Sequence, residues 1–341
     1  MKPAELGLGA IRSPSEWHLR PEYSSRFIIF AVIAVLLLAF SAHRTEMDRM
    51  VIMSSDAVLS VVGVKEESQV AKGLGRIFTD LFPMVITDRR DVARIENFDP
   101  DRLPWFSRIE TETQITSRLN PETMAMENVE TDRQVLVQPG GYLLHVVMLM
   151  LQTIEIAIWG TILAILIAIP LGFFGARNYA PIASLYHASR TISSFLRAMP
   201  ELIIALFLVL AYGFGPIAGV LALGLHTAGF LGKFFAEDIE NADKGPQEAL
   251  HSTGANRVKV LTYTVLPQVA PSYMAYVQYI LERNIRTATI LGIVGAGGIG
   301  QELKGRFEMF NFGHVATILL VILVTVILLE YLTGTLRKRM M

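Results

Sequence analysis

The sequence contains no cysteine, which excludes disulfide bonds, thiolate catalysis and cysteine-bound metal sites. Charged residues make up only 18% of the 341 residues, against about 25% in a typical soluble domain. The formal net charge is −1, so the composition lacks the basic footprint of a nucleic-acid-binding protein. The seven histidines are scattered without the regular spacing of metal ligands. We therefore predict no metal, no cofactor and no nucleic-acid partner.

A nucleotide-binding loop is also missing from the sequence. The pattern G-x-x-x-x-G-K-[ST] does not occur, because Gly232-Lys233 is followed by Phe234 and lacks the upstream glycine. The chain is therefore predicted not to be an enzyme that hydrolyses ATP. An ATP-driven process would need a separate ATPase chain.

Long apolar runs are abundant. Hydrophobic residues make up 52% of the chain and the mean hydropathy is +0.43, which is typical of a polytopic membrane protein. We predict six transmembrane helices, at 27–43 and near 150–174, 192–213, 215–236, 269–293 and 314–335. A secretory signal with a cleavage site near Ala39 and Ser41 is the competing interpretation of the first run. The long preceding segment, which contains three glutamates, favours a membrane helix.

The basic residues predict the orientation. Twelve lie in segments that the six spans place on one side, and the short loops opposite hold only Lys304 and Arg306. By the positive-inside rule, the basic side is cytoplasmic, together with both termini. The twelve are Lys2, Arg12, Arg20, Arg26, Arg177, Arg190, Lys244, Arg257, Lys259, Arg337, Lys338 and Arg339.

The segment 44–140 differs in composition, because residues 43–140 hold 17 acidic and 12 basic side chains. Topology predicts an external insert between the first two spans. Apolar residues recur at helical spacing over 68–82, which predicts an amphipathic helix at the membrane surface or, equally, a helix with a buried face in a small external domain. The rest of 84–140 is weakly patterned, and we predict no structure for it.

A polar, basic stretch separates the fourth and fifth apolar runs. Residues 248–267 read EALHSTGANRVKVLTYTVLP. Gly245 and Pro246 are suited to begin a short helix, Glu248 would sit in its first turn, and Gly254 would end it. The residues Glu248, Ala249, Leu250, Gly254, Leu266 and Pro267 resemble the EAA loop of ABC importer membrane subunits. In that family the loop is the coupling helix that docks in a groove of the ATPase. The chain departs from the family pattern at Leu250 and Thr264.

A glycine-rich segment, Gly295-Ala-Gly-Gly-Ile-Gly300, fits the dinucleotide-binding pattern G-x-G-x-x-G. That fold requires a strand before the glycines and a second strand after them. Here both flanking runs are long enough to cross a membrane, so we favour a glycine-rich external re-entry with close helix packing. The candidate packing or gate glycines are Gly292, Gly295, Gly297, Gly298 and Gly300.

Several charges fall inside apolar runs, where they usually face the bundle interior or a water-filled cavity. They are Arg197, Glu201, Glu282, Arg283 and Arg286. Two interpretations remain open. The pairs Glu282–Arg286 and Arg197–Glu201 could hold spans together, or Arg283 or Arg286 could give an anion pathway its positive potential. His226 is interpreted as a helix contact, and Pro170 and Pro200 as kinks or breaks.

Segments across 150–336 resemble phosphonate-type permeases: GTILAILIAIPLGFFGARN, RAMPELIIAL, GVLALGLHTAGFLGKFFAE, ERNIRTATILG and GIVGAGGIGQEL. With the EAA-like loop, they make the chain resemble the permease subunit of a phosphonate ABC importer. The resemblance implies an all-α polytopic membrane protein of six transmembrane helices, five of which form a type I importer core.

The resemblance also implies an organisation and partners. Residues 1–26 would be a cytoplasmic segment and 141–341 the permease domain, with a cytoplasmic coupling loop at 237–268. The partners would be a cytoplasmic ABC ATPase dimer, a periplasmic phosphonate-binding protein and a second copy of this chain in the bacterial inner membrane. Phosphate, phosphite or another oxyanion could replace phosphonate as cargo. A secondary transporter or channel and a membrane-embedded oxidoreductase are the alternatives from other classes.

Overall fold

The structure is a computed structural model that describes residues 25–61, 68–95, 98–100, 103–104, 106–119 and 126–340. Most of the predicted N-terminal cytoplasmic segment lies outside this part of the chain. The chain divides into two compact units, residues 1–78 and 79–341, which are described separately.

The first unit is built from helices. Helix α1 (Ser25–Arg44) contains the first predicted span, and it is long and apolar enough to cross a membrane. Helix α2 (Met47–Val61) follows it. Helix α3 (Gln69–Leu81), which ends in the second unit, confirms the helix predicted from apolar spacing over 68–82. Its position at a membrane surface stays a prediction.

A three-stranded antiparallel sheet opens the second unit, where we predicted no structure. Its strands are β1 (Asp88–Asp91), β2 (Arg108–Leu119) and β3 (Met126–Gln138), in the order β1-β3-β2, and a short 3₁₀ helix, η2 (Val92–Arg94), follows β1. The all-α prediction therefore holds for the permease domain but not for this insert. The overlooked signal is in β2, where Ile109, Thr111, Thr113 and Ile115 place β-branched residues at every second position.

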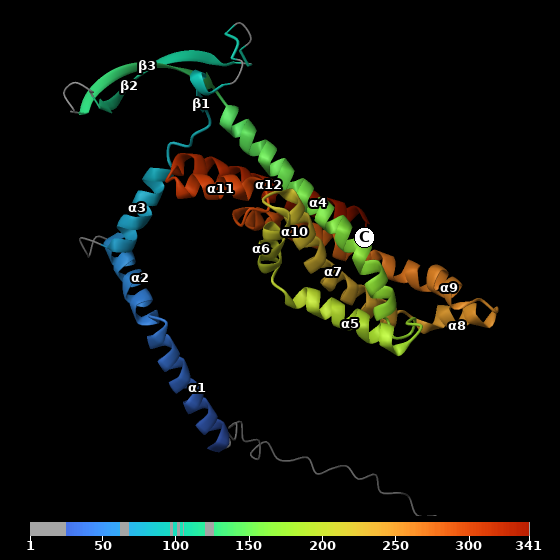
Figure 1. Cartoon of the computed structure of the whole chain (residues 1–341). Coiled ribbons are helices and arrows are strands. Elements are labelled where there is room, and N and C mark those ends of the chain that lie inside the picture. Colours follow the sequence, from blue (N-terminus) through green and yellow to red (C-terminus); the bar gives the residue numbers. More distant parts are fainter. Residues whose placement is uncertain are drawn as a thin grey trace, which may run out of the picture. The chain divides into compact units, whose positions relative to one another are not determined.

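The rest of the second unit is helical. Its elements are α4 (Gly141–Gly175), α5 (Ala183–Ala198), α6 (Glu201–Tyr212), α7 (Pro216–Asn241), α8 (Lys244–Ser252), α9 (Arg257–Val260), the π-helical turn η3 (Leu261–Val265), α10 (Leu266–Ile293), α11 (Ile299–Glu308) and α12 (Phe312–Met340). Helix α4 runs the length of the unit, with the sheet near its first residue and α8 and α9 near its last (Figure 1).

Four described helices are long and apolar enough to cross a membrane: α1, α4, α7 and α12. The pair α5 and α6 makes a fifth if it is one span, bent by 89° at the break that contains Pro200. That break confirms the effect expected of Pro200, whereas α4 continues past Pro170. Helix α10 corresponds to the remaining predicted run, and its charged residues lower its apolar character. The count of six spans stays a prediction.

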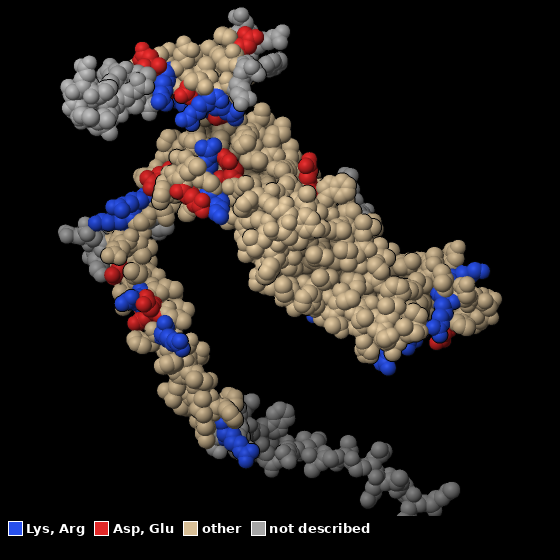
Figure 2. Space-filling view, in the orientation of Figure 1, with Lys and Arg blue, Asp and Glu red and all other residues tan. Residues whose placement is uncertain are grey.

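Charged side chains are distributed as a membrane protein requires. On the face of the second unit shown in Figure 2, Lys, Arg, Asp and Glu gather toward its two ends and leave a broad, mostly uncharged surface between them. Large apolar side chains on this unit are exposed, among them Trp159 of α4, Phe207 of α6 and Leu323 of α12. Exposure of this kind is stable only where lipid or another apolar surface replaces water.

The core is centred on the contact between α4 and α7, which make a close, glycine-lined approach. A Cβ atom at Gly172 of α4 would lie 2.6 Å from the Cβ of Phe235 in α7. A Cβ at Gly224 of α7 would likewise lie 2.6 Å from the Cδ2 of Leu163 in α4. The glycines therefore set the distance between the helices, because any larger residue would overlap the facing side chain.

A buried polar network joins α10 to this pair. The amide of Asn284, which is 2% exposed, donates to the Thr161 hydroxyl at 2.9 Å and accepts from the Thr227 hydroxyl at 3.1 Å. Thr161 in turn donates to the Ala157 carbonyl at 2.7 Å. Each buried side-chain group in this network is thus satisfied, which avoids the large cost of an unpaired polar atom in an apolar core.

We predict that Gly172→Ala destabilises the purified protein, because the added methyl group has no room against Phe235. Overpacking of this kind costs about 1–3 kcal/mol. The matched control is Gly334→Ala in α12, where a Cβ would meet nothing within 4 Å. Thermal unfolding in detergent should show a lower Tm for the first variant only, and equal Tm values would mean that α4 and α7 do not approach this closely.

Candidate coupling surface and membrane charge cluster

Helix α8 occupies the loop where a coupling helix was predicted, but it begins earlier than expected. Its first residue is Lys244, and the Asp243 carboxylate caps it by accepting from the Gly245 amide at 3.0 Å. Pro246 therefore lies third in the helix rather than first, and Glu248 lies in the second turn rather than the first. The sequence-based start was wrong by two residues because Asp243, the better N-cap, was overlooked.

The predicted end of the helix is confirmed. Gly254 follows the last turn with φ at +84°, a left-handed conformation that strains other residues. The Asn256 side chain then accepts from the Lys259 amide at 2.9 Å and starts α9. Leu266 and Pro267 begin α10 after the π-helical turn, and Pro267 is tolerated in this first turn because the amide it lacks would have no helical partner.

The predicted coupling residues differ in exposure along α8. Glu248 and Ala249 are exposed, whereas Leu250 is half-buried. Beside them is a groove of about 380 Å³, lined by residues that include Asn178, Lys244, Glu248, His251 and Arg257. The helix thus presents a polar, accessible surface at one end of the second unit.

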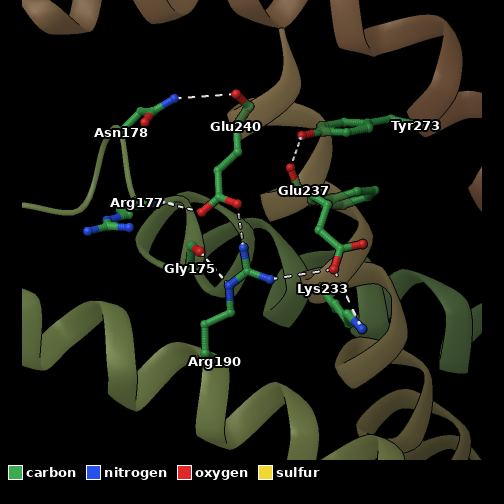
Figure 3. Close-up of polar contacts among 9 residues, drawn as sticks. Gly175, Arg177, Asn178, Arg190, Lys233, Glu237, Glu240 and Tyr273 are labelled. Carbon is green, nitrogen blue, oxygen red and sulfur yellow. Dashed lines mark hydrogen bonds and ion pairs between the residues drawn. The ribbon is translucent and has the colours of Figure 1, made fainter.

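An ion-pair network joins α4, α5 and α7 close to the start of α8 in the sequence, and sequence reasoning missed it. Arg190 of α5 contacts Glu240 near the end of α7 at 2.9 Å and donates to the Gly175 carbonyl at the end of α4 at 2.8 Å (Figure 3). The Glu240 carboxylate also accepts from the Arg177 amide at 2.7 Å. From the sequence, Arg177 and Arg190 contribute only to the basic residues that predict the orientation. The acidic residues at the end of α7 were the available signal for a pairing partner.

A second set of contacts ties α8 to its neighbours. The Tyr179 hydroxyl donates to the Gln247 side chain at 3.1 Å, and burial raises the pKa of Tyr179, so the hydroxyl remains a donor at neutral pH. Gln247 donates to the Ala242 and Asp243 carbonyls at 3.1 and 2.9 Å. The Asp243 amide donates to the Gln268 side chain of α10 at 3.0 Å. Movement of α8 would therefore be transmitted to both α7 and α10.

Two of the predicted intramembrane charges, Glu201 and Arg283, form a cluster with His226, a partner that the sequence did not indicate. Arg283 of α10 lies 3.4 Å from Glu201 at the start of α6 and 3.1 Å from His226 Nε2 of α7. The same His226 nitrogen lies 3.2 Å from Glu201, and the other ring nitrogen contacts the Met199 carbonyl at 2.8 Å. His226 is 5% exposed and connects three helices at the α5–α6 break.

The other charges separate from this cluster. Arg286 contacts Glu282, as the i,i+4 spacing predicted. The predicted pair of Arg197 with Glu201 is wrong, because Glu201 pairs with Arg283. Within the described residues Arg197 has no ion pair, and its guanidinium lies 5.7 Å from the Phe230 ring. The bend at Met199 and Pro200 turns Glu201 away from the helix that carries Arg197.

The glycine segment forms a tight turn between two helices, α10 and α11. A Cβ at Gly300 would lie 2.9 Å from the Gly292 Cα, so the small residues permit close packing as predicted. Gly295, Gly297 and Gly298 have positive φ angles, and the Gly295 carbonyl accepts from the Gly215 amide before α7 at 3.0 Å. Because a helix precedes the glycines, the strand that a dinucleotide-binding turn needs is not there.

Comparison with known proteins decides the family. Residues 168–341 match the family described as "Binding-protein-dependent transport system inner membrane component". The chain belongs to this family. The match runs from the last eight residues of α4 through α12, so it contains the predicted coupling loop, the charge cluster and the glycine turn of this inner membrane component.

Individual relatives agree with this assignment. The chain is 50% identical over 260 residues to "Putative phosphite transport system permease protein HtxE" of Stutzerimonas stutzeri, covering 76% of this chain and 100% of that protein. It is 44% identical over 119 residues to "Putative cryptic phosphonate transport system permease protein PhnE2" of Escherichia coli strain K12, covering 35% of this chain and 98% of that one.

A solved structure supports the fold. An inward-facing structure of the MetNI methionine ABC transporter superposes with a TM-score of 0.52 at 19% identity. The superposition covers 60% of this chain and 99% of that chain. The permease therefore has the helical arrangement of a type I importer membrane subunit, and its β-sheet lies before the segment that matches the family.

We predict that Glu201 and Arg283 of this permease are energetically coupled. Arg283→Met alone should destabilise the protein, because it removes a partner of a carboxylate at membrane depth, and Glu201→Gln alone should also destabilise it. The double variant should lose less than the sum of the two losses, with a coupling energy of about 0.5–3 kcal/mol. Thermal or denaturant unfolding of all four proteins measures it, and strict additivity would contradict the pairing.

Proposed function

We propose that this permease is the membrane-spanning subunit of an ATP-driven importer that carries phosphonate, or a related phosphorus oxyanion such as phosphite or phosphate, across the inner membrane. The observation that carries the proposal is helix α8. It is capped at both ends, its contacts reach Tyr179, the end of α7 and Gln268 of α10, and it exposes Glu248 and Ala249. The relatives named for phosphite and phosphonate transport support the cargo class.

The proposed orientation follows from charge. Basic residues concentrate on the side of α8, so this helix and both termini are cytoplasmic. A cytoplasmic ABC ATPase dimer engages α8, and a periplasmic binding protein delivers the oxyanion to the opposite side. Two copies of the chain form the pathway about a two-fold axis.

The mechanism is alternating access. Closure of the ATPase dimer moves α8, and the contacts through Gln247, Gln268 and the Arg190 network carry that movement into the spans. The oxyanion must bind the outward and inward states with different affinity, because equal affinity would shift neither population.

Reconstitution tests the proposed function directly. Proteoliposomes that contain the permease, its ATPase and its binding protein should take up radiolabelled methylphosphonate or phosphite. Uptake should require ATP on the side of the membrane where the ATPase lies. Competition among phosphonate, phosphite and phosphate ranks the cargo. Equal uptake without the ATPase would favour a secondary transporter, and no uptake of any of the three would refute the proposed cargo class.

We predict that changes in α8 uncouple transport without preventing insertion. Glu248→Arg reverses the charge on the exposed surface of α8. At an interface with the ATPase, placing like charges against each other costs several kcal/mol. Gly254→Pro removes the helix stop, because proline cannot adopt the positive φ of this residue. Both should lower uptake by at least about tenfold at equal expression.

The matched control is Glu308→Arg in α11, the same charge reversal on a glutamate whose side chain is 64% exposed and which lies outside α8. It should retain uptake. Full uptake by the two α8 variants would remove the coupling role from this helix.

We predict that Arg286→Ala lowers phosphonate uptake more than Arg286→Lys, because lysine keeps a positive charge beside the pathway. Initial uptake rates at equal expression measure the difference. Equal rates would mean that Arg286 serves only its ion pair with Glu282. They would not contradict the proposal that transport is driven by ATP.

A further inference from the structure

A second cavity lies at the end of α4 opposite to α8. It has a volume of about 740 Å³, which is within the range of about 300–1,000 Å³ typical of small-molecule sites. Strand β1 contributes Arg89 and Arg90, and α11 contributes Arg306. The first turns of α4 and α12 contribute aromatic and imidazole side chains, Tyr142, His145 and His314.

The wall of this cavity is held by backbone contacts between the insert and the permease helices. The Ile86 carbonyl accepts from the Tyr142 amide at 3.1 Å, and the Val85 amide donates to the Gly313 carbonyl at 3.1 Å. The Thr317 hydroxyl of α12 donates to the Val85 carbonyl at 2.6 Å. The segment before β1 is therefore fixed against the starts of α4 and α12, so Arg89 and Arg90 are held at the cavity by the fold.

Each arginine is oriented by a carboxylate through a single nitrogen. Arg90 contacts Asp88 through Nε at 2.8 Å, and Arg306 contacts Glu302 through Nε at 2.8 Å. In both cases no second carboxylate of the described residues pairs with the guanidinium. Arg89 contacts Glu112 through Nη1 at 2.7 Å. A guanidinium has five N–H donors, so one carboxylate leaves most of them for a second ligand.

Arg306 is held more firmly than the others. Its guanidinium lies 5.1 Å from the ring of Tyr142, which is 2% exposed. The Tyr142 hydroxyl donates to the Glu302 carboxylate that also binds Arg306, at 3.4 Å. A guanidinium fixed in this way loses little side-chain entropy when it binds an anion.

We propose that this cavity is a binding site for the tetrahedral oxyanion of a phosphorus compound, with Arg90 and Arg306 as its main donors. Guanidinium groups match phosphorus oxyanions in charge and in the spacing of their donors. Of the charged side chains that line the cavity, three are arginines and one, Asp88, is acidic. The volume leaves room for an organic substituent beside the oxyanion.

The role of the site in import rests on the proposed function, which places this end of α4 on the external side. There the site would receive cargo before it enters the pathway. The binding itself does not depend on that role. A phosphorus oxyanion could come from free cargo or from the headgroup of an anionic lipid, and the experiment separates these sources.

The experiment uses the full-length chain in nanodiscs of phosphatidylcholine alone, with methylphosphonate titrated by calorimetry. The variants Arg90→Gln and Arg306→Gln should each weaken binding by at least about tenfold, the loss expected for one charge-assisted hydrogen bond. Arg94→Gln is the matched control, since Arg94 is an exposed arginine in η2 of the same insert that does not line the cavity. Asp88→Asn should tighten binding several-fold, because it removes the acidic side chain that competes for Arg90.

A second arm tests lipid. Native mass spectrometry of the same proteins, purified from membranes with phosphatidylglycerol, should show retained lipid that Arg90→Gln and Arg306→Gln lose if a headgroup is the ligand. Loss of either ligand in both variants, with Arg94→Gln unchanged, supports the site. Binding of both ligands unchanged in the variants, or no binding of either ligand to the parent, overturns it.

Two controls separate this site from folding and from transport. The Arg90 side chain is 62% exposed, so Arg90→Gln tests the site even if Arg306→Gln fails to fold. Uptake by the reconstituted importer is measured in parallel. If uptake is intact but ligand binding does not depend on Arg90 and Arg306, the site is refuted and the proposed function stands. If ligand binding depends on them but no ATP-driven uptake occurs, the proposed function is refuted and the site stands.

Discussion

The close approach of α4 and α7 is the constraint on which the rest of the permease depends. Glycines such as Gly172 and Gly224 bring the two helices together, and facing side chains fill the space. Helices have little hydrophobic drive to associate in lipid, so packing and hydrogen bonds must supply the attraction. Helices α5, α6 and α10 then pack against α7, and the Asn284 network fixes α10 to both members of the pair.

Charges within this frame are paired between helices, and several of the partners lie where a helix breaks or ends. Glu201 lies directly after the α5–α6 bend, where it meets His226 and Arg283. Arg190 in the middle of α5 pairs with Glu240 near the end of α7, four residues before α8 begins. Pairing offsets part of the free-energy cost of removing these charges from water. It also links helices that are distant from one another in the sequence. Helix α8 has no buried residue, so it is connected to its neighbours by polar contacts rather than by a hydrophobic core.

Local patterns predicted much of this architecture. Helix α3, the helix stop at Gly254, the break at Pro200 and the Glu282–Arg286 pair follow from spacing and backbone preference within a few residues. Errors arose where distant residues compete. Arg197 and Glu201 are i,i+4 in sequence, but the bend ends the helix between them, and Arg283 from another helix takes the carboxylate. The β-sheet was overlooked because β2 and β3, although long and adjacent in the sequence, are mostly polar, so the alternation of their β-branched residues is a weak signal.

The sequence by itself determined that the chain is a membrane protein without its own nucleotide-binding loop, and it placed the predicted coupling loop between two apolar runs. These properties depend on composition and on residues a few positions apart, and both can be read from the sequence directly. Only the tertiary structure decided which charges pair, how α8 is anchored and where Arg90 and Arg306 meet around one cavity. Arg90 and Arg306 lie more than two hundred residues apart in the sequence, and only the folded backbone brings such residues together.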